Sequence, residues 1–239
     1  MKLDVLAIGA HPDDVELSCG GTIIKLVKQG RRVGVLDLTQ GELGTRGDRT
    51  TRAREAARAA AVMGVALREN LKLPDGDINA DMDSRIRLVR VIRNLQPEIL
   101  LFPYQIDRHP DHERAHVLCR EAWFSAGLQK FRTSLRGRSQ EPFRPRAYYH
   151  FMQWYEFTPS FIVDVSAEFE QRVETMRAYR SQFYDPASRE RETILSTPEF
   201  LEMIRTKLEY YGYRIGKKYG EPFFSPASLE VKDLFLLNT

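Results

Sequence analysis

The sequence predicts an α/β fold of Rossmann-like, three-layer α/β/α type, with a mostly parallel sheet between two layers of helices. Short apolar runs, such as 3–8 and 32–38, alternate with longer segments of helical composition, and this alternation is typical of parallel sheets. In addition, two clusters of His and Asp directly follow apolar runs. Because such sheets bind ligands at the carboxyl ends of their strands, we expect the active site at that edge.

Each element has its own signal in the sequence. The run 3–8 is apolar except for Asp4, as in a buried strand, and the helix that follows it (16–29) ends before a glycine. Segment 51–63 is rich in Ala and Arg, which favour helices, and 83–95 has apolar residues at helical spacing. The other expected elements are strands at 32–38, 70–73, 98–102, 147–152 and 161–165, helices at 110–125, 168–181 and 198–215, and a last apolar stretch within the tail, 222–237.

Length and composition indicate one domain, 1–239. Within it, 1–126 is the Rossmann-like part with both clusters, and 127–239 adds the remaining strands, helices and substrate-side loops. No apolar run approaches the roughly 20 residues that span a bilayer, and Cys19 and Cys119 form no disulfide pattern. We therefore expect a cytoplasmic protein. The net charge of +3 does not by itself indicate nucleic-acid binding.

The first cluster places His11 and Asp14 on one tight turn, where an imidazole and a carboxylate can face the same point. A third ligand from the second cluster, 109–112, would complete a His/Asp/His set with an open position, as in catalytic zinc sites. Such a metal lowers the pKa of its bound water, and Asp13 is the obvious carboxylate to take the proton. His109 is a candidate donor to the developing oxyanion.

Two other interpretations of these residues are open. Asp13 and Asp14 precede a helix, where carboxylates act as caps, although capping does not account for a matching His/Asp cluster at a second strand end. Residues 112–116 read His-Glu-Arg-Ala-His, which matches the zinc-protease pattern H-E-x-x-H. That interpretation leaves the His11 cluster without a role.

The two motifs, Ala-His-Pro-Asp-Asp at 10–14 and His-Pro-Asp-His at 109–112, resemble those of the LmbE-like or PIG-L family of zinc-dependent N-acetylglucosaminyl deacetylases. Segments 39–47, 102–103 and 181–183 resemble the branch that deacetylates N-acetylglucosaminyl-malate in bacillithiol biosynthesis. The resemblance implies hydrolysis of an acetamide to acetate and an amino sugar. Deacetylation of a chitobiose-type or inositol-linked sugar, or sugar binding without catalysis, are the alternatives.

The resemblance also implies roles for individual residues. His11, Asp14 and His112 would hold the metal. This metal would be Zn²⁺, and Fe²⁺ also suits ligands of this type. Asp13 would be the general base, His109 the general acid or electrophile, and Asp111 the partner of His109. Arg52 and Arg146 would contact the substrate, and Glu42 is an additional candidate for the sugar hydroxyls. Phe200 stands where some relatives have a tyrosine oxyanion donor, so either Tyr184 or another tyrosine takes this role, or His109 acts alone with the metal. His116 would support a ligand or be structural.

The expected partners follow from the same reasoning. The resemblance predicts a small amino-sugar conjugate as the substrate and a homo-oligomeric assembly. We expect no membrane partner. We also expect no nucleic-acid partner, because the arginines at 132–146 lack interleaved aromatic residues at a defined spacing.

Overall fold

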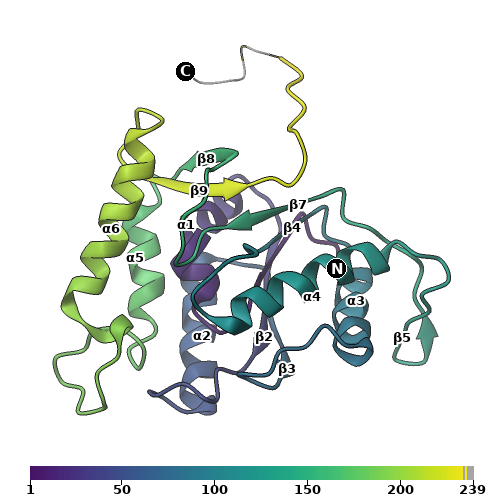
Figure 1. Ribbon diagram of the computed structural model, residues 1–239, viewed down its shortest axis with the longest axis horizontal. Coiled ribbons are helices and arrows are strands. Elements are labelled where there is room, and N and C mark those ends of the chain that lie inside the picture. Colours follow the sequence, from purple (N-terminus) through teal and green to yellow (C-terminus); the bar gives the residue numbers. More distant parts are fainter. Residues whose placement is uncertain (234, 236–239) are drawn as a thin grey trace.

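A seven-stranded sheet forms the centre of the computed structural model, which describes residues 1–233 and 235, and helices lie on both of its faces (Figure 1). The strand order is β3-β2-β1-β4-β7-β9-β8. The first five strands in this order run parallel, and β9 is antiparallel to both of its neighbours. The predicted α/β class with a mostly parallel sheet is therefore confirmed. The strands are β1 (Val5–Gly9), β2 (Val33–Thr39), β3 (Leu67–Leu73), β4 (Ile99–Pro103), β7 (Ala147–Phe151), β8 (Phe161–Asp164) and β9 (Gly220–Phe224).

The helices lie close to the expected positions. They are α1 (Asp14–Lys28), α2 (Arg49–Met63), α3 (Met82–Leu95), α4 (Pro110–Ala126), α5 (Phe169–Arg177) and α6 (Pro198–Tyr213), with a 3₁₀ turn, η1, at Ile194–Ser196. Among the residues described, no helix is both long enough and apolar enough to cross a membrane.

The largest differences from the prediction have identifiable causes. Strand β3 begins at Leu67 and not at 70, because Arg68 on this outermost strand pairs with the buried Asp37 of β2. Helix α5 ends early because the Glu55 carboxylate accepts the backbone N–H of Ser181, at 2.8 Å. A short hairpin, β5 (Ser134–Leu135) with β6 (Arg138–Ser139), interrupts the expected connection, and positions 234, 236 and 237 of the predicted apolar tail lie outside the described residues.

Alternate side chains of β1 build the two halves of the core. Leu6 and Ile8 belong to a cluster with α3 and α4, whereas Val5 and Ala7 belong to a cluster with α1 and the end of α2. This follows from the two-residue period of a strand that is covered on both faces. Helix α5 packs against α1 and α2, and α6 lies outside it, against β8 and β9 (Figure 1).

Strands β1 and β4 are neighbours, although about ninety residues separate them in sequence. Strands β2 and β3 extend the sheet on one side of β1, and β4 and β7 extend it on the other. This is a topological switch point, where the loops after adjacent strands diverge and leave a crevice for a ligand. The two predicted motifs follow β1 and β4, so they meet at this crevice.

Helix α1 is interrupted at Cys19, which has non-helical angles of φ −145° and ψ 21°. The buried Arg172 donates to the Leu17 carbonyl oxygen at 2.5 Å, and Glu221 accepts the backbone N–H groups of 21 and 22 at 2.9 and 2.7 Å. The two charged groups also lie 2.9 Å apart. A buried ion pair therefore satisfies the groups that the interruption releases.

Candidate metal centre and active site

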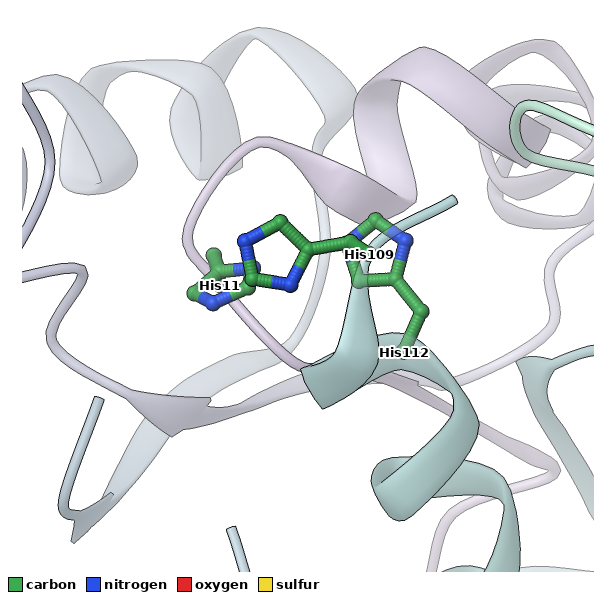
Figure 2. A group of neighbouring side chains, drawn as sticks. All are labelled: His11, His109 and His112. Carbon is green, nitrogen blue, oxygen red and sulfur yellow. The ribbon is translucent and has the colours of Figure 1, made fainter. Parts of the chain in front are cut away.

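Three histidines from the two motifs meet at the carboxyl edge of β1 and β4 (Figure 2). His11 follows β1, while His109 and His112 come from the start of α4. The ring centroids lie 4.7 Å apart for His11 and His109, 4.9 Å for His109 and His112, and 5.5 Å for His11 and His112. Each ring offers a nitrogen within 4.8 Å of the others. The two clusters therefore form one site.

The Asp14 carboxylate lies between two of these histidines. Its Oδ2 is 3.6 Å from His11 Nδ1, and its Oδ1 is 3.2 Å from His112 Nε2. Oδ2 also accepts the backbone N–H of His11 at 2.8 Å. Two imidazoles and one carboxylate thus converge, and this is the donor set of a metal site with an open position.

The other ring nitrogen of His11, and that of His112, also faces a carboxylate. His11 Nε2 lies 3.0 Å from Asp75 Oδ1, and His112 Nδ1 lies 2.7 Å from Asp107 Oδ1. Metal-binding histidines commonly donate their second N–H to a carboxylate, which fixes the ring and its tautomer. His11, Asp75 and Asp111 form a second group with metal-ligand spacing that shares the His11 ring. The residues present fit a divalent metal ion.

The charges of the site reflect these contacts. Burial opposes a charge on His112, but the neighbouring Asp14 and Asp107 outweigh it and raise the pKa of His112 to about 9. For His11, hydrogen bonds to Asp111, Asp14 and Asp75 similarly overcome burial and raise the pKa well above its ordinary value. Protons therefore compete with a metal ion for both rings.

Asp13 points to a different partner from Asp14. Its Oδ2 lies 3.2 Å from Arg52 Nη2, and the same guanidinium donates to the Pro12 carbonyl oxygen. Asp13 has φ 112°, which side-chain-bearing residues rarely adopt and which is found at functional sites. Burial raises the pKa of Asp13 to about 7, against the opposing effect of Arg52. This is a suitable value for a proton acceptor at neutral pH.

Asp111 does not hold His109 in the predicted way. Its buried carboxylate accepts the Gly76 N–H at 2.7 Å and lies 3.4 Å from His11 Nε2. It is the backbone N–H of Asp111 that donates to His109 Nδ1, at 3.2 Å. The reason is that His109 is the N-cap of α4, so its ring turns back onto the free amides of the first turn. With Nδ1 as the acceptor, a neutral His109 carries its proton on Nε2.

Two predicted substrate residues lie away from the site. The Arg146 side chain is 71% exposed and pairs with Glu98 at 3.3 Å. Arg146 precedes β7, which is parallel to β4, so it lies at the amino edge of the sheet and the prediction was wrong. Glu42 accepts the backbone N–H groups of Gln40 and Asp75 at 3.1 and 3.3 Å, so its carboxylate holds two loops together and does not line the cavity.

The three histidines line a cavity of about 970 Å³. Arg52 also lines it, and α6 contributes a largely apolar part of the wall. The Arg108 guanidinium stacks on Trp154, with Cζ 4.3 Å from the ring centroid. Across the described residues, no carboxylate pairs with Arg108, although it lines the cavity. The α6 residues of the wall are Phe200, Met203, Ile204, Thr206, Lys207 and Tyr210.

The candidates for a tyrosine donor have different positions. Phe200 is buried in the cavity wall, where it provides no hydroxyl group. Tyr184 is 48% exposed and is not among the lining residues, whereas Tyr210 is. Tyr184 therefore does not take the predicted place, whereas His109 does line the cavity.

His116 is not part of the centre. Its Nδ1 lies 3.1 Å from the Pro103 carbonyl oxygen, and His150 shares that oxygen at 3.0 Å. A protease-type H-E-x-x-H site requires both histidines of the pattern to face one metal. Here His112 faces Asp14 and His116 faces the backbone of β4, so the alternative interpretation of 112–116 is wrong.

Several residues of the site were not predicted. Asp75 follows β3 in a Pro-Asp-Gly turn, and Asp107 stands two residues before the second motif. Their positions after parallel strands were the available signal. Gln153, Trp154 and Lys207 belong to no motif, and only the folded chain brings them to the cavity.

Comparisons with known proteins agree with this geometry. The sequence model of the PIG-L family, "GlcNAc-PI de-N-acetylase", matches residues 6–123. Diacetylchitobiose deacetylase of Thermococcus kodakarensis is 32% identical over 229 residues, which make up 91% of this chain and 80% of that protein.

Solved structures extend the similarity to the whole fold. The conserved protein TT1542 from Thermus thermophilus has 36% sequence identity and a TM-score of 0.85, over 96% of this chain and 97% of that one. N,N'-diacetylchitobiose deacetylase from Pyrococcus horikoshii has 28% identity and a TM-score of 0.77, over 92% and 82% of the two chains. Since the similarity spans nearly the full length and includes both motifs, the chain belongs to the PIG-L family of deacetylases.

Proposed function

We propose that the protein hydrolyses the N-acetyl group of an N-acetylglucosamine conjugate and binds its metal through His11, Asp14 and His112. The observation that carries this proposal is the position of Asp14 between two histidines, each of which has a carboxylate on its other nitrogen. The site lies in a cavity, and the named relatives remove acetyl groups from an acetylated amino sugar. Zn²⁺ suits these ligands, and so does Fe²⁺.

The other residues of the two motifs have distinct roles in this proposal. When bound, the metal supplies Lewis-acid polarisation of the acetamide carbonyl and a water of lowered pKa. Asp13 is buried and close to the metal ligands without being one of them, so it takes the proton of the attacking water. His109 lines the cavity and accepts at Nδ1, so its Nε2–H donates to the oxygen on which negative charge develops. Acetate and the protonated amine are the products.

For the substrate we propose the malate conjugate of N-acetylglucosamine. Segments 39–47 and 181–183 favour this branch by resemblance, and malate carries two carboxylates that need cationic partners. Arg108 is a cation in the cavity lining without a carboxylate partner among the described residues. Because arginine binds carboxylates in a bidentate manner, we assign the recognition of malate to Arg108.

Acetate release from matched substrates tests the proposal. Metal-loaded protein is assayed with the malate conjugate, free N-acetylglucosamine, diacetylchitobiose and the inositol conjugate. We expect the highest kcat/KM for the malate conjugate, loss of turnover with a chelator and recovery after Zn²⁺ or Fe²⁺ is restored. A malate conjugate no better than the free sugar would disprove the substrate, and failure to release acetate from all four would disprove deacetylation.

Substitution of Arg108 tests how malate is recognised. R108M removes the guanidinium, so the ratio of kcat/KM for the malate conjugate to that for the free sugar should fall roughly 10- to 100-fold, as expected for loss of a charge-assisted hydrogen bond. R120M is the matched control, because Arg120 is an exposed residue of α4 outside this cavity. An unchanged ratio in R108M would show that Arg108 does not select the substrate.

A further inference from the structure

Gln153 lies within the metal centre, although it belongs to neither motif. It stands two residues past the end of β7, which is the strand next to β4. Its side-chain amide donates from Nε2 to Asp14 Oδ1 at 2.9 Å, and the same nitrogen is 3.4 Å from His112 Nε2. The amide therefore contacts the edge at which two of the proposed ligands meet.

The orientation of this amide follows from its partner. An ionised Asp14 carboxylate can only accept hydrogen bonds, so the NH₂ group must face it. The Gln153 Oε1 atom is then buried and has no hydrogen-bond partner among the described residues. A buried acceptor without a partner destabilises the folded state, because it has lost its hydrogen bonds to water. A side chain that is only half satisfied is an unfavourable choice for stability alone, which indicates a role in the site.

The backbone around Gln153 is fixed on both sides. Lys207 of α6 donates from Nζ to the Gln153 carbonyl oxygen at 2.5 Å. The next backbone N–H, of Trp154, donates to Asp107 Oδ2 at 2.8 Å, and the other oxygen of Asp107 contacts His112 Nδ1. Gln153 and the proposed ligand His112 are thus held through the same carboxylate.

We propose that Gln153 is a positioning residue of the metal centre, which sets the direction of the Asp14 carboxylate. The Asp14 Oδ2 atom already accepts a hydrogen bond from the backbone N–H of His11, and Gln153 donates a second hydrogen bond, to Oδ1. With both oxygens held, the carboxylate cannot rotate away from the two histidines. The inference rests on the metal site of the proposed function, and Gln153 acts through Asp14.

Metal affinity is the direct test. Q153M keeps the length of the side chain but removes both the N–H donor and the buried acceptor. We expect its affinity for Zn²⁺ and Co²⁺, measured by competition with a chelator, to fall about 10- to 100-fold, as for other residues that orient metal ligands. The visible absorption of the Co²⁺-loaded protein should also change, because it reports ligand geometry. Thermal unfolding of metal-free Q153M should stay close to that of the wild type.

Two further variants make the test decisive. Q153N keeps an amide on a side chain that is one methylene group shorter, so the amide no longer reaches Asp14. Q153N should therefore also bind the metal more weakly than the wild type. Q171M is the control, since the Gln171 amide donates to the Val62 carbonyl oxygen at 2.7 Å, outside the cavity lining, and should leave affinity unchanged. If Q153M and Q153N bind both ions as tightly as the wild type does, the inference about Gln153 is overturned, while the proposed metal site is not. A wild-type protein that binds neither ion would overturn the proposed metal site and this inference with it.

Discussion

Asp13 and Asp14 are adjacent and both buried, yet their carboxylates have different neighbours. Asp14 faces His11 and His112, and Asp13 faces Arg52. The backbone makes this possible, because φ 112° at Asp13 turns the two side chains in different directions. In the proposed function, the two identical side chains therefore have separate tasks, one in metal binding and one in proton transfer.

Asp13→Asn tests this separation. Asparagine has the same shape but cannot take a proton, so kcat should fall about 10²- to 10⁴-fold, the usual contribution of a general base. Metal content should stay the same, because Asp13 is not a proposed ligand. Steady-state acetate release and metal analysis of the same preparation provide the measurement. An Asp13→Asn enzyme with full activity would contradict the proposed role.

Gly41 offers a second test at the scale of single residues. It has φ +66°, and a Cβ there would lie 2.7 Å from the Arg52 Cζ, so Gly41→Ala strains the backbone and displaces the guanidinium from Asp13. Gly137 has φ +76° and open space around it, so Gly137→Ala introduces the backbone strain alone. Gly137→Ala should lose about 1 kcal/mol of unfolding free energy in urea, and Gly41→Ala should lose more, because it also separates the buried Arg52 from Asp13. Only Gly41→Ala should also lose kcat, and equal kcat values in the two variants would contradict the contact.

Helix α1 depends on distant parts of the chain. Its interruption at Cys19 is held by Arg172 of α5 and Glu221 of β9. Glu221→Gln keeps the shape but leaves the buried Arg172 without a counter-charge. This should cost about 3–5 kcal/mol in urea unfolding. Glu174→Gln, which removes an exposed ion pair with Arg177, should cost less than about 1 kcal/mol, and similar losses in both variants would disprove the role of burial.

Elements with strong local signals were predictable from the sequence. The composition of α2 and the apolar spacing of α3 placed both helices within two residues of their observed starts. The differences arise where a distant side chain decides the local structure. Arg68 extends β3 because Asp37 lies beside it, and α5 ends where Glu55 takes the Ser181 N–H. Local periodicity contains no information about such partners.

At the scale of the whole molecule, the motifs located the site but not its surroundings. His11 and His112 could be brought together because each motif follows a buried strand of a parallel sheet. The partners Asp75 and Asp107 and the later Gln153 depend on strand order, which one sequence does not provide. The error at Arg146 had a different cause, since a residue that precedes a parallel strand belongs at the opposite edge from the site.

The stability of the whole molecule should depend on pH through His150. Burial, together with the neighbouring His116, lowers the pKa of His150 from 6.5 to about 4. Between these values the unfolded chain binds a proton that the folded protein excludes, so stability decreases as the pH falls through this window. His150→Asn keeps a donor for the Pro103 oxygen but does not titrate.

Urea unfolding at pH 7.5 and 5.5, with chelator present throughout, measures this effect. The wild type should lose about 1 kcal/mol more than His150→Asn between the two pH values, since a full unit of pKa difference corresponds to about 1.4 kcal/mol. Parallel pH dependences of the two proteins would show that His150 is not responsible.

The pairing of β1 with β4 has a consequence for the order of events during synthesis. A chain that is still emerging from the ribosome exposes His11 and Asp14 about a hundred residues before His112. Contacts of such long sequence separation form late, because much chain entropy must be lost first. If His11, Asp14 and His112 are the ligands, as proposed, tight capture of a metal ion has to wait until the two strands have paired. In the cell, metal occupancy would then mark chains that have completed this folding step, in contrast to small zinc modules in which the ion itself drives folding.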